Sequence, residues 1–199
     1  MPFSSTPDPI GNYQLIARTK KRDMLAGIGA QAVFGGPGND TLTGNSQATP
    51  DGLYQIPPIL SGGAGNDTYI IKDGTFSIIA DLGGGNDTIK TNLNINNVSF
   101  ASINGRDIYA TDGSTSVIIV DPLGTENANN KIESVFFGKK RYSTEQLSRM
   151  ALNSNNYLGE FTYAQLESAG YINFEILGLD PLGVDNYISS ARFNNSIVS

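Results

Sequence analysis

The chain has 199 residues, of which 39% are apolar and 16% charged, and its net charge is −6 at pH 7. The apolar share suffices for a folded core, whereas the negative charge argues against nucleic acids and anionic membranes as partners, because both select basic patches. Cysteine and histidine are absent, which excludes disulfides and thiolate or imidazole metal sites. No apolar run approaches the roughly 18 residues of a membrane span, and residues 1–16 have no pattern of a cleavable signal peptide.

Residues 1–14 are predicted to form an N-terminal arm. The segment carries Pro2, Pro7 and Pro9, which favour an extended chain over a regular helix or central strand. Such a short segment would cover the end of a sheet poorly. It could instead dock along a strand edge of a neighbouring subunit, and we therefore expect self-association through this end of the protein.

Three glycine-rich segments that follow share one pattern. Residues 35–42, 62–69 and 83–89 read GGPGNDTL, GGAGNDTY and GGGNDTI. The first two match G-G-x-G-x-D-x-U-x in full, where U is a large apolar residue, and the third is one residue short in its glycine run. A single Gly-Asn-Asp is equally a hairpin turn signal, but three copies in one frame indicate an internal repeat.

The repeat suits a hard cation. Glycines permit positive φ angles and close backbone approach, so that their carbonyls can point at an ion, and each aspartate adds charge. This gives the oxygen shell that calcium prefers, with roughly six to eight ligands. The segments resemble the calcium-binding repeats of the RTX (repeats-in-toxin, haemolysin-type) family. The predicted ligands of Ca²⁺ are Asp23, Gly35, Gly36, Gly38, Asp40, Gly62, Gly63, Gly65, Asp67, Gly83, Gly85 and Asp87.

The resemblance implies a fold class, an all-β chain with an RTX parallel β-roll over residues 15–91. Asp23 precedes Asp40 by 17 residues, close to two nonapeptides, and suits a cap on the first site. The interval from Asp40 to Asp67 is 27 residues, and residues 47–58 are predicted to be an excursion that absorbs the additional length.

Glycine loops stop after residue 91. Residues 92–142 alternate apolar and polar residues between Asn-Gly and Asp-Gly turns, and resemble the strand-rich segment that often follows RTX repeats. We expect this segment to be a β cap on the roll. Residues 143–199 are predicted to form a short mixed α/β tail, in which 143–151 begin with helix-capping residues. The hydroxyl-rich end, 188–199, resembles the uncleaved signal read by type I secretion machinery.

An enzyme is not expected. Histidine, the commonest general base, and cysteine, the strongest thiol nucleophile, are both missing, and no G-x-S-x-G, HExxH or Walker motif occurs. Enzymes that resemble this family carry catalysis in a domain before the repeats, and the short segment ahead of the first repeat here leads us to expect no such domain. Two roles remain open for a secreted or cell-surface protein that folds on calcium. One is a structural protein that forms a homo-oligomer or polymer in calcium, and the other is a calcium-dependent binding module for a glycan, a surface or a partner protein.

Overall fold

The fold is known from a computed structural model. The structure describes residues 14–17, 21–29, 31–48, 55–81, 83–125, 128, 131–153, 157–162 and 165. They form 16 β-strands and one α-helix. Residues 1–13 of the predicted N-terminal arm and the predicted secretion signal lie outside the described residues, and Gln14, the last residue of the arm, begins β1.

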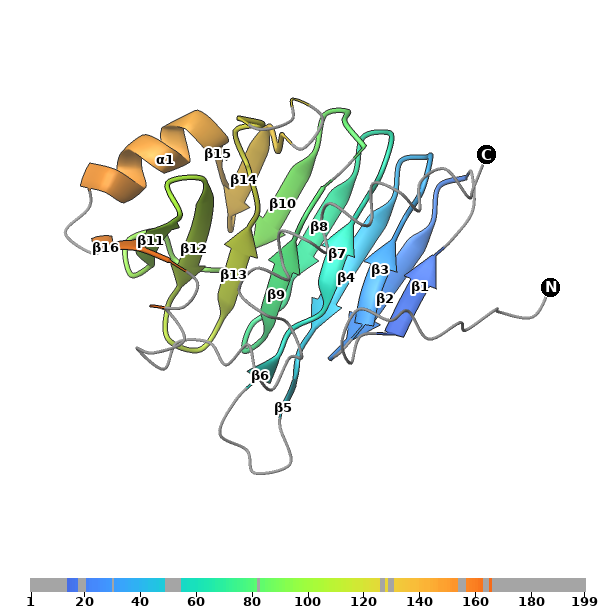
Figure 1. Cartoon of the computed structure of the whole chain (residues 1–199), viewed down its shortest axis with the longest axis horizontal. Coiled ribbons are helices and arrows are strands. Elements are labelled where there is room, and N and C mark those ends of the chain that lie inside the picture. The colour runs from blue at the N-terminus through green and yellow to red at the C-terminus, as the bar shows by residue number, and fades with distance from the viewer. Residues whose placement is uncertain are drawn as a thin grey trace.

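Most strands belong to two sheets that face each other (Figure 1). The eight-stranded sheet contains, in spatial order, β1 (Gln14–Ala17), β3 (Gln31–Phe34), β7 (Ile59–Ser61), β9 (Phe76–Ile79), β13 (Ser116–Ile119), β12 (Asp107–Thr111), β11 (Ser99–Ile103) and β16 (Tyr157–Phe161). The six-stranded sheet contains β15 (Lys140–Ser143), β14 (Ser134–Phe137), β10 (Thr88–Thr91), β8 (Thr68–Ile71), β4 (Thr41–Asn45) and β2 (Met24–Ile28).

Two smaller elements complete the fold. The helix α1 (Thr144–Asn153) follows β15, and Leu147 and Ala151 on one of its faces are buried. A short antiparallel hairpin of β5 (Gln47–Ala48) and β6 (Gln55–Ile56) lies within the excursion expected at residues 47–58. Among the described helical residues, no segment is long and apolar enough to cross a membrane.

The chain passes alternately between the two sheets. β3 leads to β4, β7 to β8, β9 to β10 and β13 to β14. We call each such pair of consecutive strands, with the loop that joins them, a coil. Each strand pairs in parallel with the corresponding strand of the next coil. The glycine loops make three of these passages, from the eight-stranded to the six-stranded sheet, and they lie side by side at the top in Figure 1. Residues far apart in the sequence are therefore neighbours in the loops.

The main core lies between the sheets. The apolar residues that follow the three Gly-Asn-Asp-Thr segments, Leu42, Tyr69 and Ile89, are fully buried there. They oppose residues of the eight-stranded sheet such as Leu60 and Ile79. Since side chains alternate along a strand, the intervening residues of the eight-stranded sheet point away from this core, and they are buried in a second apolar cluster. Along β7, β9, β12 and β13, both faces of the eight-stranded sheet are thus largely buried.

The prediction of an RTX parallel β-roll followed by a β cap and a short mixed α/β tail is wrong: the structure is largely β, but its sheets do not form a simple parallel roll. Both sheets are mixed. In the eight-stranded sheet, β13 pairs in parallel with β9 and antiparallel with β12. In the six-stranded sheet, β14 pairs in parallel with β10 and antiparallel with β15. The glycine-loop strands and the later strands share continuous backbone ladders. The physical reason is that an outer parallel strand needs a hydrogen-bonding partner, and strands joined by short turns supply it in antiparallel orientation.

Candidate metal centre

Glycine conformation shapes the three loops. Gly36 and Gly63 have φ angles of 90° and 92°, and Gly38 and Gly65 have φ angles of 150° and 134°, in the region that favours glycine. The corresponding residues of the third loop are Gly84 and Gly85 at 76° and 155°, so Gly83 does not carry the positive φ there. The loops stack so closely that a Cβ at Gly63 would lie 2.5 Å from the carbonyl oxygen of Gly36.

The same close approach recurs along the stack. A Cβ on Gly65 would collide with the carbonyl of Gly38, and a Cβ on Gly85 would collide with the carbonyl of Gly65. A Cβ on Gly83 would collide with the carbonyl of Gly63. Backbone carbonyl oxygens of one loop therefore lie against the glycines of the next loop, and such oxygens are ligands that calcium accepts.

The loop aspartates form a ladder that runs through the stack. The Oδ1 atom of Asp40 accepts a hydrogen bond of 2.7 Å from the backbone N–H of Asp23. Asp67 accepts one of 2.7 Å from the N–H of Asp40, and Asp87 one of 2.7 Å from the N–H of Asp67. The last rung is Glu133, whose Oε2 accepts from the N–H of Asp87 at 2.7 Å. One carboxylate oxygen of each loop aspartate is thus fixed by a backbone N–H of the preceding segment of the stack.

The other oxygen of each loop aspartate is left without a protein partner. Asp40, Asp67 and Asp87 are at most 1% exposed, and their Oδ2 atoms have no hydrogen-bond partner among the residues that the structure describes. A buried carboxylate oxygen with no partner is strongly unfavourable, because it loses hydration without compensation. These atoms are therefore the places where a cation would have the largest effect on the stability of the fold.

Burial changes the acidity of these groups. It raises the pKa of Asp67 to about 7, against the effect of the hydrogen bond from Asp40 and with the help of the neighbouring charges of Asp87 and Asp40. Burial and the charge of Asp81 raise the pKa of Asp87 to about 8. Burial, together with the charge of Asp23, also raises the pKa of Asp40. In the protein without a cation, the charged form of this ladder is disfavoured.

The asparagines of the repeat have a different role. The Oδ1 atom of Asn39 accepts a hydrogen bond of 2.9 Å from the backbone N–H of Asn66, and Asn66 does the same for Asn86 at 2.9 Å. All three side chains are exposed. They hold one loop against the next from the solvent side, and their position away from the buried carboxylates argues for turn residues.

The structure brings the predicted ligands together in one stack, with Asp23 at one end. Asp23 precedes β2 and contributes its backbone N–H to the first rung. Two acidic residues of the stack were not predicted from the sequence, Asp81 and Glu133. Asp81 is 1% exposed and ends the coil before the third loop, and its Oδ1 accepts from the N–H of Gly63 at 3.2 Å. Glu133 is in the place that Asp23, Asp40 and Asp67 occupy in earlier coils, directly before a strand, a position visible in the sequence once the coils are aligned.

The donor set is mixed rather than purely carboxylate. No group of three or more His, Cys, Asp or Glu side chains that could hold a metal ion occurs among the described residues. A cation in the stack would therefore depend on one or two aspartates together with backbone carbonyls. This is a donor set for a hard cation with a high coordination number, and it suits neither zinc nor copper.

Comparisons with known proteins identified no relative of this chain. No protein-family model matches the chain, and no curated protein matches it.

Proposed function

We propose that this protein binds calcium between its stacked glycine loops and completes its folding when calcium is present. The observation that carries the proposal is the set of three buried Oδ2 atoms of Asp40, Asp67 and Asp87, which have no hydrogen-bond partner in the described part of the chain. Each lies beside a loop whose carbonyls face the neighbouring loop. The resemblance of the three segments to RTX repeats supports the same conclusion.

Calcium fits this site better than magnesium does. The loops offer oxygen atoms alone, several of them backbone carbonyls, and calcium accepts six to eight such ligands in variable geometry. Magnesium demands a near-ideal octahedron with shorter bonds and retains its waters. A site built from carbonyls of two loops and buried carboxylates between them leaves little room for such waters.

The test is a calcium titration of chelator-treated full-length protein, followed by isothermal titration calorimetry and by circular dichroism. We expect saturable heat of binding and a gain of β signal with calcium, and a much smaller response to magnesium at equal concentration. Absence of calcium binding at millimolar concentration, or an equal response to both ions, would contradict the proposal.

We further propose that the protein is secreted, or lies at the cell surface, and uses no catalytic chemistry. Cytosolic calcium is low, so the loop carboxylates would repel one another and keep the chain loose for type I export. Outside the cell, millimolar calcium exceeds even weak extracellular sites of roughly 10⁻⁴–10⁻³ M, and binding then contributes to folding. Secretion of the full chain, but not of a chain lacking residues 188–199, by a type I exporter would test this point.

The proposed role in that compartment is structural, with self-association in calcium. Support comes from β2, the last strand of the six-stranded sheet within the described residues, on which Met24 is 85% exposed. An edge strand of this kind can pair with a second copy of the chain. Size-exclusion chromatography with light scattering, with and without calcium, tests the proposal, and Met24→Lys should weaken assembly while leaving the calcium titration unchanged. A monomer in millimolar calcium would favour the alternative role, a calcium-dependent binding module.

A further inference from the structure

The third coil differs from the first two at one position. β7 and β9 pair in parallel with Leu60 opposite Ile79, and β3 and β7 with Val33 opposite Leu60. Two residues further along each strand, the register leads to Gly35, Gly62 and Asp81. The first two coils thus end in glycine before the loop, and the third coil ends in an aspartate.

The glycines at this position make room for the loop carboxylate. A Cβ on Gly62 would lie 2.6 Å from the Cβ of Asp67 and would collide with its carboxylate. A Cβ on Gly35 would lie 3.0 Å from the Cβ of Asp40 and 2.5 Å from the carbonyl oxygen of Gly62. In the first two coils, a single carboxylate therefore occupies the space between the sheets at this level.

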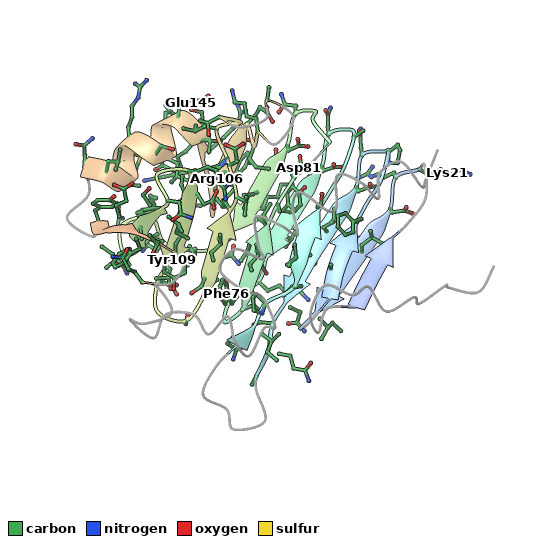
Figure 2. The ribbon with its side chains drawn as sticks, in the orientation of Figure 1. Lys21, Phe76, Asp81, Arg106, Tyr109 and Glu145 are labelled. Carbon is green, nitrogen blue, oxygen red and sulfur yellow. The ribbon has the colours of Figure 1, made fainter. Side chains whose placement is uncertain are left out.

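The third coil places two carboxylates in the equivalent space. The path from Asp81 to Asp87 is six residues long, whereas that from Gly62 to Asp67 is five, and the additional residue makes room for the Asp81 side chain. Asp81 lies at the upper end of β9 in Figure 2, opposite the end that carries Phe76. Asp81 and Asp87 are at most 1% exposed, and Asp87 keeps a buried Oδ2 atom with no hydrogen-bond partner in the described chain.

Burial raises the pKa of Asp81, and hydrogen bonds to its carboxylate offset this effect only in part. The N–H of Gly63 donates to its Oδ1 atom, and the hydroxyl of Tyr69 also forms a hydrogen bond with it. Tyr69 is fully buried and accepts a hydrogen bond of 2.6 Å from the N–H of Gly62. The hydroxyl of this tyrosine therefore links the second loop to Asp81.

We propose that Asp81 joins Asp87 and the carbonyls of the second loop in a calcium site of higher affinity than the site between the first and second loops, so that calcium binds there first. This inference rests on the proposed calcium binding and assigns an order to it. The physical reason is charge: Asp81 adds a buried carboxylate that the first two coils lack, which strengthens the attraction for a divalent ion, and the ion removes the repulsion between Asp81 and Asp87.

The experiment compares wild type, Asp81→Gly and Asp81→Asn by calorimetric calcium titration of chelator-treated full-length protein. Asp81→Gly gives the third coil the residue that the other coils have, and Asp81→Asn removes the charge at nearly constant shape. Asp73→Asn, in an exposed turn before β9, is the matched control. We expect a tight and a weak step in wild type and in the control, and at least about a tenfold weaker first step in both Asp81 variants.

A spectroscopic readout locates the first site. The chain has no tryptophan, so terbium emission excited through aromatic rings must arise from tyrosine or phenylalanine. Terbium added to wild type at less than one equivalent should give sensitised emission that Tyr69→Phe strongly reduces. Should an Asp81 variant fail to fold, this Tyr69 comparison still tests the order of binding.

The outcomes distinguish failure of the proposed calcium binding from failure of the proposed role of Asp81. Wild type that binds no calcium contradicts the proposed function itself. Wild type that binds calcium, with the first step unchanged within twofold in both Asp81 variants, overturns only the role of Asp81. Sensitised emission that Tyr69→Phe leaves unchanged would likewise overturn the assignment of the first site.

Discussion

Buried carboxylates occur in two regions of this protein, and the two regions compensate them differently. In the strand-rich region, Asp107 is 1% exposed and lies against the guanidinium of Arg106, with Nε 2.6 Å from Oδ1 and Nη2 2.8 Å from Oδ2. The Oδ1 atom also accepts from the N–H of Asp121 at 2.8 Å. In the glycine loops, Asp40, Asp67 and Asp87 each have one oxygen held by a backbone N–H and the other without a hydrogen-bond partner in the described chain.

This difference in how the carboxylates are compensated shows which region of the fold depends on ions in solution. A bidentate arginine compensates a buried carboxylate within the chain itself, independently of the solution. The loop aspartates depend on a backbone N–H alone for the charged form, and the remaining cost of burial must be met by protonation or by an added cation. Although the two regions share continuous sheets, we expect them to respond differently to calcium.

The largest effect expected is that of chelation. Removing calcium should unfold the loops and the strands that they join, β4, β8 and β10, because each site occupied at 100 times its dissociation constant contributes about 2.7 kcal/mol. Hydrogen exchange in EDTA should rise first in these strands, and later in β12 and β13. Equal exchange in both regions, or an unchanged circular dichroism spectrum after thorough chelation, would show that the comparison is mistaken.

The converse experiment removes the internal cation. Arg106→Met leaves Asp107 buried without its partner, which typically destabilises a protein by about 3–5 kcal/mol. This loss should appear in calcium and in EDTA alike, as measured by denaturant unfolding monitored in the strand-rich region. Arg106→Met combined with Asp107→Asn should recover much of the stability, and no recovery would assign the loss to packing of the arginine stem.

The sequence allowed parts of this comparison to be predicted. The repeat spacing predicted the positions of the three turns, because turns with positive φ angles require glycine. It also predicted the apolar residues that follow them, and Leu42, Tyr69 and Ile89 are indeed fully buried. It did not predict mixed sheets, since the direction of a strand depends on which neighbour its ladder meets. Asp81 was missed because a polar residue at the end of Ile78-Ile79-Ala80 reads as an ordinary strand end. The buried ion pair of Arg106 and Asp107 could not be predicted from the sequence, because adjacent opposite charges that follow an Asn-Gly turn usually lie in solvent.

A narrower test asks whether the position of an aspartate in the stack determines its effect. Asp67 lies between two other loop aspartates and contributes to the spaces on both of its sides. Asp67→Ala should therefore raise the calcium midpoint of folding by about tenfold or more, which corresponds to about 1.4 kcal/mol. Asp73→Ala, in an exposed turn without the glycine frame, should leave the midpoint unchanged. Equal midpoints for the two variants in the same titration would contradict the assignment.

The pH dependence of the calcium-free protein should show which region limits its stability. The pKa values of Asp67 and Asp87 are raised to about 7 and about 8, above the unfolded value near 3.9. At these two sites the folded state therefore binds more protons, so their contribution to stability is fully present below about pH 4 and is lost as pH rises through 8, by at most about 1.4 kcal/mol per group and pH unit. Thermal unfolding in EDTA at pH 5, 6, 7 and 8 should show a falling midpoint.

Two variants sharpen the pH experiment. Asp67→Asn and Asp87→Asn remove the titrating groups, and each should flatten the decline in EDTA. Saturating calcium should also reduce the decline in wild type, because bound calcium favours the charged carboxylates. A midpoint that rises with pH in EDTA would mean that carboxylates stabilised in their charged form elsewhere dominate the calcium-free protein.

The smallest effect concerns an exposed ion pair next to the last rung of the ladder. Lys131 and Glu145 form a salt bridge of 3.0 Å, and their side chains are 36% and 45% exposed. Hydrogen bonding to Lys131 lowers the pKa of Glu145 to about 2, yet exposed pairs contribute only about 0–1 kcal/mol, because solvent screens the charges and the side chains lose freedom. Glu145→Gln should therefore lower the unfolding midpoint slightly, equally with and without calcium, and this small loss should vanish in 1 M salt. A calcium-dependent loss would instead couple the start of α1 to Glu133 and the loop stack, and it would extend the calcium-dependent region into the part of the protein that compensates its own charges.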